Sequence, residues 1–365
     1  MVAPIQLTPY VNYLRRRLFG NIPLGTVAYR QEVLCHQETV KTRPTLLLPG
    51  QVDRVTGTDP ATTIEWELET ATSGFLRPAP TIAYHIKDAI LVDGSIYQGR
   101  FKSFIAARSF FKPPSARSEP RHLKTIGLAS SHLGSKFFGH WLVDDCIQFR
   151  LSEQYGRPLC LRGPINQNHQ RTYQTYLNQD WAPIDRAWID HLIVYQDFHW
   201  GTAQDSLRGA QIRSMRAQAR THLPAGAGQL LVYLRRGATG TPRLIQNEAE
   251  LLNHLEKRGF VVADIETNSL EHVLRLLANA KIVVSVEGSH VTHCVYSVPE
   301  NSGLVVLQPP DRFLSFHRGW TASANVWYGF VVGALGERGY IFSSAEILDT
   351  VDLMVRQMEV MAGVQ

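Results

Sequence analysis

Between residues 229 and 310, short apolar runs alternate with amphipathic stretches, and this alternation restricts the fold more than any other feature of the chain. Each run is long enough for a buried strand but too short for a helix. Strands that alternate with helices at this spacing pair in parallel through right-handed crossovers. The four runs are residues 229–234, 260–263, 281–286 and 303–307. This part of the chain is therefore predicted to form a doubly wound, parallel α/β unit.

The stretches between these runs carry signals of helix ends. Asn247 followed by Glu250 is the pattern of a capping box, in which two side chains satisfy the first backbone N–H groups of a helix. Gly259 stands where a glycine commonly ends a helix. Ser269 is the expected cap of the next helix. Both connections are therefore predicted to be helical.

The length of 365 residues exceeds one ordinary α/β core, so more than one domain is expected. A second, less regular succession of strands and helices begins near residue 121. Before it, Asp93-Gly94 lies between alternating apolar runs and predicts a β-hairpin. Linker-like composition at residues 112–120 and 224–228 suggests boundaries. The predicted parts are a mixed, β-containing segment (1–120), two α/β domains (121–223 and 224–343) and a C-terminal helix (344–365).

The charge balance favours a small anionic ligand. The chain has 37 Lys and Arg against 32 Asp and Glu, a net charge of only +5. Nucleic-acid binding usually needs a continuous basic face, whereas a phosphate ester needs only a few arginines. A mildly basic, solvated surface explains the charge equally well.

The cysteines and the apolar runs bear on location. No CxxC pair or metal-ligand grouping occurs, so the cysteines are expected to be reduced thiols in a cytosolic protein. They are Cys35, Cys146, Cys160 and Cys294. No stretch has the composition of a signal peptide or a membrane span. The basic and apolar cluster from Tyr13 to Phe19 either touches an anionic membrane surface or is an ordinary helix flank.

A candidate anion site lies where the strand at 281–286 runs into Glu287-Gly-Ser-His290. A glycine at the start of a helix exposes backbone N–H groups, which attract anions. Arg235 and Arg236 follow the neighbouring strand and are expected at the same sheet edge, where α/β proteins bind ligands. Arginine suits a diphosphate because its donors are bidentate and its charge is permanent. The alternative is that Gly288 only eases a turn and the arginines face water.

Spacing argues against several other sites. No GxGxxG or Walker loop is present, and a nucleophile elbow around Ser289 would need glycines where the chain has Glu287 and Val291. Asp144 and Asp145 are neighbours on a predicted helix and point in different directions. We therefore expect neither a metal ion nor a bound cofactor.

His140 and Asp144 form a candidate proton-transfer pair. They are four residues apart on a predicted helix that begins near Phe137, so they lie on one face. A general base needs a titratable group within hydrogen-bond reach of the proton that it removes. In the alternative interpretation, the histidine satisfies a backbone group and the aspartate is solvated.

These segments together resemble glycosyltransferase family 61. His140-Trp-Leu-Val-Asp144 is similar to the His-Trp-x-x-Asp signature of that family. Residues 233–248 resemble its Arg-Arg…Arg-x-x-x-Asn-Glu stretch, 270–289 its helix, strand and Gly-Ser turn, and 305–310 its closing strand. The resemblance covers roughly residues 80–310 and is nearest to the bacterial branch of capsular or exopolysaccharide biosynthesis. Where many members read His-Gly-x-Gly-Leu-Thr-Asn, this chain reads Glu287-Gly-Ser-His-Val-Thr-His293, so the contacts made there in relatives cannot be copied.

The resemblance implies a GT-B-like architecture, with two Rossmann-like domains facing a cleft and a β-containing segment before them. Residues 121–223 would bind the acceptor and residues 224–343 the donor. The implied reaction is metal-independent, inverting transfer of a hexose or pentose from a nucleotide-sugar. A UDP-sugar is the expected donor. The implied acceptor is a glycan or glycolipid of capsule, exopolysaccharide or lipopolysaccharide. The expected location is the cytoplasm, with peripheral contact to the inner membrane face as an option and no nucleic-acid partner.

The resemblance also implies roles for the candidate residues. Asp144 is expected to be the base, with His140 as its orienting partner or as the base itself. The donor diphosphate is expected to bind Arg235 first, assisted by Arg236, Arg243 and the backbone of Gly288, Ser289 and His290. Glu287 would accept from ribose hydroxyls.

Two rival functions remain open. The first is a non-catalytic subunit that binds a glycan or a nucleotide-sugar on a transferase scaffold, which the departure at 287–293 permits. The second, a nucleotide-sugar epimerase or dehydrogenase, is disfavoured because no dinucleotide glycine pattern follows any strand.

Overall fold

The structure is a computed structural model. It describes residues 5–37, 39–92, 94–105, 119–161, 167–181, 183–196, 207–224, 226, 228–237 and 242–363. The tip of the predicted hairpin at Asp93, residues 112–118 of the first predicted linker (112–120) and residues 225 and 227 of the second (224–228) lie outside these ranges. The chain forms two compact units, Met1–Gln37 with Ala79–Phe198, and Glu38–Pro78 with His199–Gln365.

The first unit is built on a mixed sheet. Its strands are β1 (Arg30–Cys35), β4 (Thr81–Val92), β5 (Ser95–Gln98), β6 (Phe101–Phe104), β7 (Arg121–Gly127) and β8 (Arg186–Gln196). The order is β6-β5-β4-β8-β7, and β1 also pairs with β4. Only β7 and β8 pair in parallel, while the other neighbours are antiparallel. The mixed α/β class is confirmed, but this sheet is mainly antiparallel and so differs from the expected Rossmann-like layout.

In the first unit, the sequence predicts single elements correctly, but not the pairing of the whole sheet. The hairpin is confirmed, because Val92 pairs with Ser95 across its turn. Outside the named strands, Leu159 and Cys160 make isolated parallel bridges to Leu128 and Pro183. The helices are α1 (Thr8–Phe19), α2 (Leu24–Val27), α4 (Phe138–His140), a π-helical turn (Trp141–Asp145), α5 (Cys146–Ser152) and α6 (Gln167–Tyr176).

The second unit contains the predicted parallel sheet. Its strands are β9 (Leu230–Arg235), β10 (Phe260–Asp264), β11 (Ala280–Val286), β12 (Gly303–Gln308) and β13 (Trp327–Val332), in the order β10-β9-β11-β12-β13. Every neighbouring pair is parallel, which confirms the prediction for the first four strands. The fifth strand, β13, was not predicted. It is a run of aromatic residues and valines around one glycine, and all six residues are buried.

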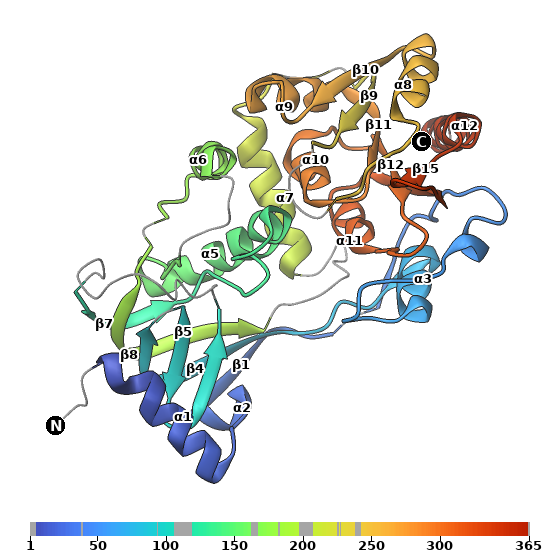
Figure 1. Ribbon diagram of the computed structural model, residues 1–365. Coiled ribbons are helices and arrows are strands. Elements are labelled where there is room, and N and C mark those ends of the chain that lie inside the picture. Colours follow the sequence, from blue (N-terminus) through green and yellow to red (C-terminus); the bar gives the residue numbers. More distant parts are fainter. Residues whose placement is uncertain are drawn as a thin grey trace. The chain divides into compact units, whose positions relative to one another are not determined.

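Helices cover both faces of this sheet, as Figure 1 shows in orange and red. Helices α8 (Glu248–Lys257) and α12 (Ser344–Gly363) pack on one face through a common core that includes Leu251, Leu255, Val351 and Met354. The remaining helices are α3 (Ile64–Thr72), α7 (Leu207–Arg220), α9 (Leu270–Ala278), α10 (His293–Ser297) and α11 (Phe316–Ser323). Two-stranded pairs are formed by β2 (Val40–Lys41) with β3 (Phe75–Leu76) and by β14 (Ala334–Leu335) with β15 (Tyr340–Ile341).

Two of the three predicted helix ends are confirmed. The Ser269 hydroxyl accepts from the backbone N–H of His272 at 3.2 Å, and Gly259 ends α8 with φ +93°. The capping box at Asn247 was wrong. Its amide donates to the Phe342 carbonyl at 2.8 Å and its oxygen accepts from the Phe342 N–H at 3.2 Å, so the side chain is committed to tertiary contacts.

In the part of the chain that the structure describes, no helix is both long and apolar enough to cross a membrane.

Candidate functional site

The basic loops after β9 and β11 leave the same edge of the parallel sheet. The two strands are direct neighbours, with Val232 opposite Val283 and Tyr233 opposite Val284. Arg235 and Arg236 therefore start at the carboxyl edge from which Glu287 and Gly288 also start, as the sequence predicts. Ligands of parallel α/β sheets bind at this edge.

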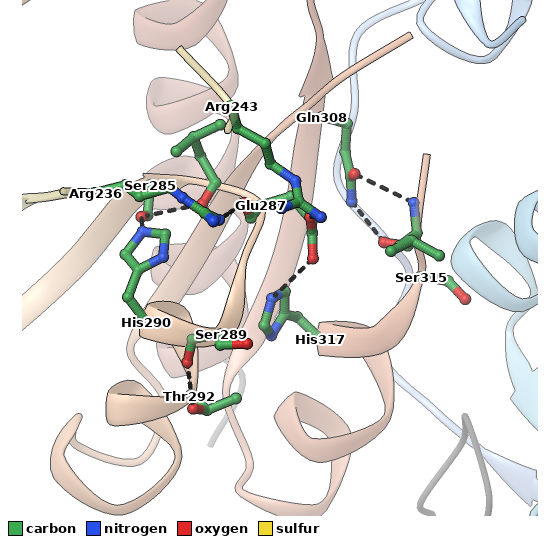
Figure 2. Close-up of polar contacts among 12 residues, drawn as sticks. Arg236, Arg243, Ser285, Glu287, Ser289, His290, Thr292, Gln308, Ser315 and His317 are labelled. Atoms are coloured by element: carbon green, nitrogen blue, oxygen red, sulfur yellow. Dashed lines mark hydrogen bonds and ion pairs between the residues drawn. The ribbon is translucent and has the colours of Figure 1, made fainter. Parts of the chain in front are cut away.

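Arg236 connects the two loops. Its Nη1 donates to the Glu287 carbonyl oxygen at 3.0 Å (Figure 2). A side chain in place of Gly288 would overlap the Arg236 guanidinium. The glycine is thus needed so that the arginine can lie against the backbone of this turn.

The side chain of Glu287, the first residue of this turn, is buried. Its carboxylate is 2.5 Å from Nη2 of Arg243, and both side chains are less than a tenth exposed. Nε2 of His317 lies 4.0 Å from the other carboxylate oxygen (Figure 2). The sequence interpretation placed Glu287 at the ribose, but the carboxylate already faces a guanidinium and an imidazole. Removal of one member of such a pair leaves a buried charge, so Glu287 also holds the loop of Arg243 in position.

His290 is held as a neutral imidazole. The Ser285 hydroxyl donates to the Leu234 carbonyl at 2.7 Å, so its oxygen accepts from Nε2–H of His290 at 2.8 Å. Burial and the charge of Arg236 keep the pKa of His290 well below its ordinary value. Its Nδ1 therefore presents a lone pair, which suits a hydroxyl donor better than a phosphate oxygen.

The electrostatics of the turn favour an anion. Burial, followed by the repulsion of Arg243, lowers the pKa of Arg236 to about 10, while Glu287 acts in the opposite direction. A guanidinium in such surroundings is penalised for its charge, and a bound anion would remove that penalty. Since Arg236 and Arg243 come from one loop and Gly288 from another, only the folded sheet edge brings them together.

Arg235 is placed differently from Arg236. Its Nη2 is 3.0 Å from Glu248 and its Nη1 3.2 Å from Asp264, so two carboxylates already hold this side chain. The helix expected after Gly288 is also short, with a 3-10 turn at Ser289–Thr292 followed by α10. The dipole of so short an element is smaller than the sequence interpretation assumed. This geometry favours Arg236 over Arg235 and the helix end as the first contact of an anion, with Arg243 held close by through its pair with Glu287.

His140 and Asp144 meet in the first unit. Nδ1 of His140 is 2.6 Å from Oδ2 of Asp144, and Asp144 is only 5 % exposed, which excludes a solvated aspartate. Both lie where α4 passes into a π-helical turn, which the sequence periodicity did not reveal. Single π turns inside helices are frequent at functional sites. Asp145 turns elsewhere and accepts from the backbone N–H of Ser131 at 2.9 Å.

Sequence reasoning missed His317, Ser285 and Arg312. His317 comes from α11, Ser285 from the interior of β11, and Arg312 acts on Arg236 by repulsion although it follows β12. No local signal marks them, because each reaches the site only through the packing of a separate element. Among the described residues, no group of three histidine, cysteine, aspartate or glutamate side chains has the geometry of a metal site.

A cavity of about 480 Å³ also lies in the second unit. Arg54, Asn247, Glu250 and Glu346 supply polar groups to its wall. None of the predicted site residues lines it, so we do not assign it to the donor.

Two buried histidines and one partly buried histidine predict a loss of stability in acid. Burial, as the first cause, holds the pKa of His290, His85 and His191 below the ordinary value. Above about pH 6.5, the pKa in the unfolded chain, these histidines are neutral in both states and cost the folded protein nothing. As the pH falls from there towards the lower pKa of the folded protein, the unfolded chain binds protons more readily, so the folded protein loses stability. The free energy of unfolding in urea should fall from pH 7.5 to 5.5, by at most about 1.4 kcal/mol per pH unit and histidine. His85→Gln should flatten the curve; equal slopes for both proteins would contradict the assignment.

Comparison with known proteins gives a family match. Residues 138–305 match the family model of Glycosyltransferase 61, a segment that contains His140, Asp144 and the whole basic turn. No curated protein matches the chain. A solved structure, the E. coli heptosyltransferase WaaC with ADP, is similar at a TM-score of 0.34 and 12 % identity over 64 % of this chain and 100 % of that one. A similarity at this level does not support an inference about the fold or the function of this protein. The family match supports the resemblance to glycosyltransferase family 61, and the protein is a glycosyltransferase.

Proposed function

We propose that the protein transfers a sugar from a nucleotide-sugar, most simply a UDP-sugar, to a glycan or glycolipid acceptor with inversion at the anomeric carbon. The family match supports sugar transfer, and the basic turn in the second unit supports a donor with a diphosphate. The proposed role is biosynthesis of a capsular polysaccharide, exopolysaccharide or lipopolysaccharide in the cytoplasm. The GT-B arrangement of acceptor and donor domains is part of this proposal.

The donor diphosphate is proposed to bind at Arg236. The guanidinium lies against the turn of Gly288, and Arg243 is anchored beside it by Glu287. When the sugar leaves, negative charge develops on the diphosphate, and fixed guanidinium donors stabilise it more strongly than the ground state. We propose that these arginines, rather than a metal ion, supply the neutralising charge. Ser289 and His290 would contribute backbone N–H groups, and Arg235 a more distant charge.

The proton is proposed to leave through the His140–Asp144 pair. The acceptor oxygen attacks the anomeric carbon, the bond from that carbon to the diphosphate breaks, and the pair takes the hydroxyl proton. Asp144 is the base in one assignment. In the other, His140 takes the proton at Nε2 while Asp144 holds Nδ1–H, a division of roles known from serine hydrolases. The observed Nδ1 contact is compatible with both.

The rival proposal is a non-catalytic subunit that binds a glycan or nucleotide-sugar. It draws on Glu287-Gly-Ser-His-Val-Thr-His293, where the chain departs from the pattern of relatives. Turnover of a labelled donor with acceptor glycans separates the two, since the rival predicts binding without transfer.

A thermal-shift screen tests the donor site. UDP, GDP, CMP and dTDP and their sugars are added to the purified protein, and the cognate nucleotide should raise the melting temperature. A ligand that binds only the native state adds about 2.7 kcal/mol at a hundred times its dissociation constant. Gly288→Ala should abolish the shift, because the new methyl group displaces Arg236.

Gly74→Ala is the matched control. A methyl group there meets no neighbouring atom within 4 Å, so the nucleotide shift should persist. The donor site is refuted if no nucleotide stabilises the wild-type protein, or if Gly288→Ala responds like Gly74→Ala.

A further inference from the structure

The outward face of α1 is apolar and aromatic. Tyr10, Tyr13, Leu14 and Leu18 are 71, 60, 57 and 73 % exposed. Their spacing of three and four residues places them on one side of the helix. A surface helix normally turns such a stripe towards the core and its polar side chains towards water. We call these four residues and the half-exposed Leu7 the α1 face.

The opposite side of α1 is held by polar contacts. Asn12 is buried, and its Nδ2 donates to the carbonyl oxygens of Gly99 at 2.9 Å and Phe101 at 3.1 Å. The helix contacts β4, β5 and β6 of the first unit (Figure 1). The α1 face is therefore directed outward by a fixed attachment and is not a helix that has failed to pack.

The charged side chains of α1 and of the sequence next to it have one sign. Arg15 and Arg17 are exposed, and Arg16 is partly exposed between them. Residues 5–31 contain no aspartate or glutamate. Within the described chain, no ion pair joins these three arginines to a carboxylate. At 100° per residue, Arg17 lies within the apolar stripe while Arg15 and Arg16 flank it on either side.

We propose that α1 docks the protein onto an anionic lipid surface, with the helix lying in the plane of the membrane. Arginines beside tyrosines and leucines match the boundary between phosphate headgroups and acyl chains. A second copy of the chain is a poorer occupant, because it would bring like charges together. The 12 residues of α1 extend about 18 Å at about 1.5 Å each, which is less than the thickness of about 30 Å of the hydrocarbon core, so the helix is too short to span a membrane. This docking does not depend on the proposed sugar transfer.

Vesicle co-sedimentation of the full chain tests the proposal. The protein is mixed with phosphatidylcholine vesicles, either pure or with about 30 % phosphatidylglycerol, at low salt and at about 0.5 M salt. Wild type should bind the anionic vesicles, bind the neutral ones weakly, and be released by salt. Arg15→Gln with Arg17→Gln should weaken anionic binding about 25-fold, at roughly five-fold per arginine. Leu14→Asn with Leu18→Asn should weaken it at least about ten-fold.

The control replaces exposed apolar side chains elsewhere. Val360→Asn with Met361→Asn changes two exposed residues near the end of α12 and should bind vesicles like wild type. Circular dichroism should show that all variants fold, since the replaced side chains of α1 are exposed. Unchanged binding of both α1 variants, or no binding of wild type to anionic vesicles, overturns the proposal. A wild-type dimer in sedimentation without lipid, converted to a monomer by the Leu14 and Leu18 changes, overturns it in favour of a second copy.

Discussion

Asp144→Asn is expected to lower the turnover number by about two or more powers of ten, the scale of general-base catalysis. Asparagine keeps the shape of the side chain but cannot take a proton, and it cannot fix Nδ1–H of His140 as a carboxylate does. Donor binding should persist, because the basic turn belongs to the other compact unit. Single-turnover transfer of a labelled sugar and the nucleotide-induced thermal shift measure the two effects separately.

The chain offers a matched control for this experiment. His122 and Asp190 form a second histidine–aspartate pair at 2.6 Å in the same unit, but both side chains are more than half exposed. Asp190→Asn should leave turnover within about two-fold, since exposed pairs contribute little. If turnover survives Asp144→Asn as well, the pair is not the base. If His140→Gln retains turnover while Asp144→Asn loses it, Asp144 is the base; equal losses favour His140 oriented by Asp144.

Arg236→Gln is expected to separate activity from stability. The ratio kcat/KM should fall about 10²–10³-fold, as when one fixed donor to a developing negative charge is removed. The melting temperature without ligand should stay equal or rise, because burial and Arg243 penalise this cation in the folded protein. A lowered pKa of a cation means that its charged form destabilises the native state, so a neutral replacement relieves that cost.

Arg275→Gln is the control for the arginine experiment. Arg275 is exposed on α9 and pairs only with the neighbouring Glu271 in the contacts described, so both activity and melting temperature should be nearly unchanged. A loss of stability in Arg236→Gln without a loss of activity would show that Arg236 is a structural residue. Arg236→Lys should recover only part of the activity, since an ammonium keeps the charge but lacks the planar fork.

The sequence predicts those parts of the fold that depend on neighbouring residues. Ser269 caps its helix because the donor that it satisfies is three residues away. Asn247 has the same local signal but forms no such contact, because the backbone of Phe342 competes for its amide. A partner 95 residues away leaves no trace in a local pattern. The same reason explains why β13 and the antiparallel pairing of β4 with β8 were not predicted, although the local β4–β5 hairpin was.

The residues of the site also fall into those that a local pattern could place and those that only tertiary packing places. Residues 286–290 and Arg236 could be placed at one edge from the sequence, because parallel strands end together. The pairing of Glu287 with Arg243 and His317 could not be predicted, since those side chains come from a loop and from α11. His140 and Asp144 were predicted to lie on one helix face and do meet there, but the π-helical turn that carries them was not.

The short bridge at Leu46 has a consequence for synthesis on the ribosome. Leu46 exchanges backbone hydrogen bonds with Tyr328 and Phe330, so an early segment completes the edge of the last parallel strand. A nascent chain must therefore hold this segment unpaired while some 280 further residues, from Leu46 to Tyr328, are translated. The second unit can close only after nearly the whole polypeptide has emerged, whereas Ala79–Phe198 of the first unit is complete much earlier. Premature termination before β13 would leave a valine-rich strand edge exposed to aggregation.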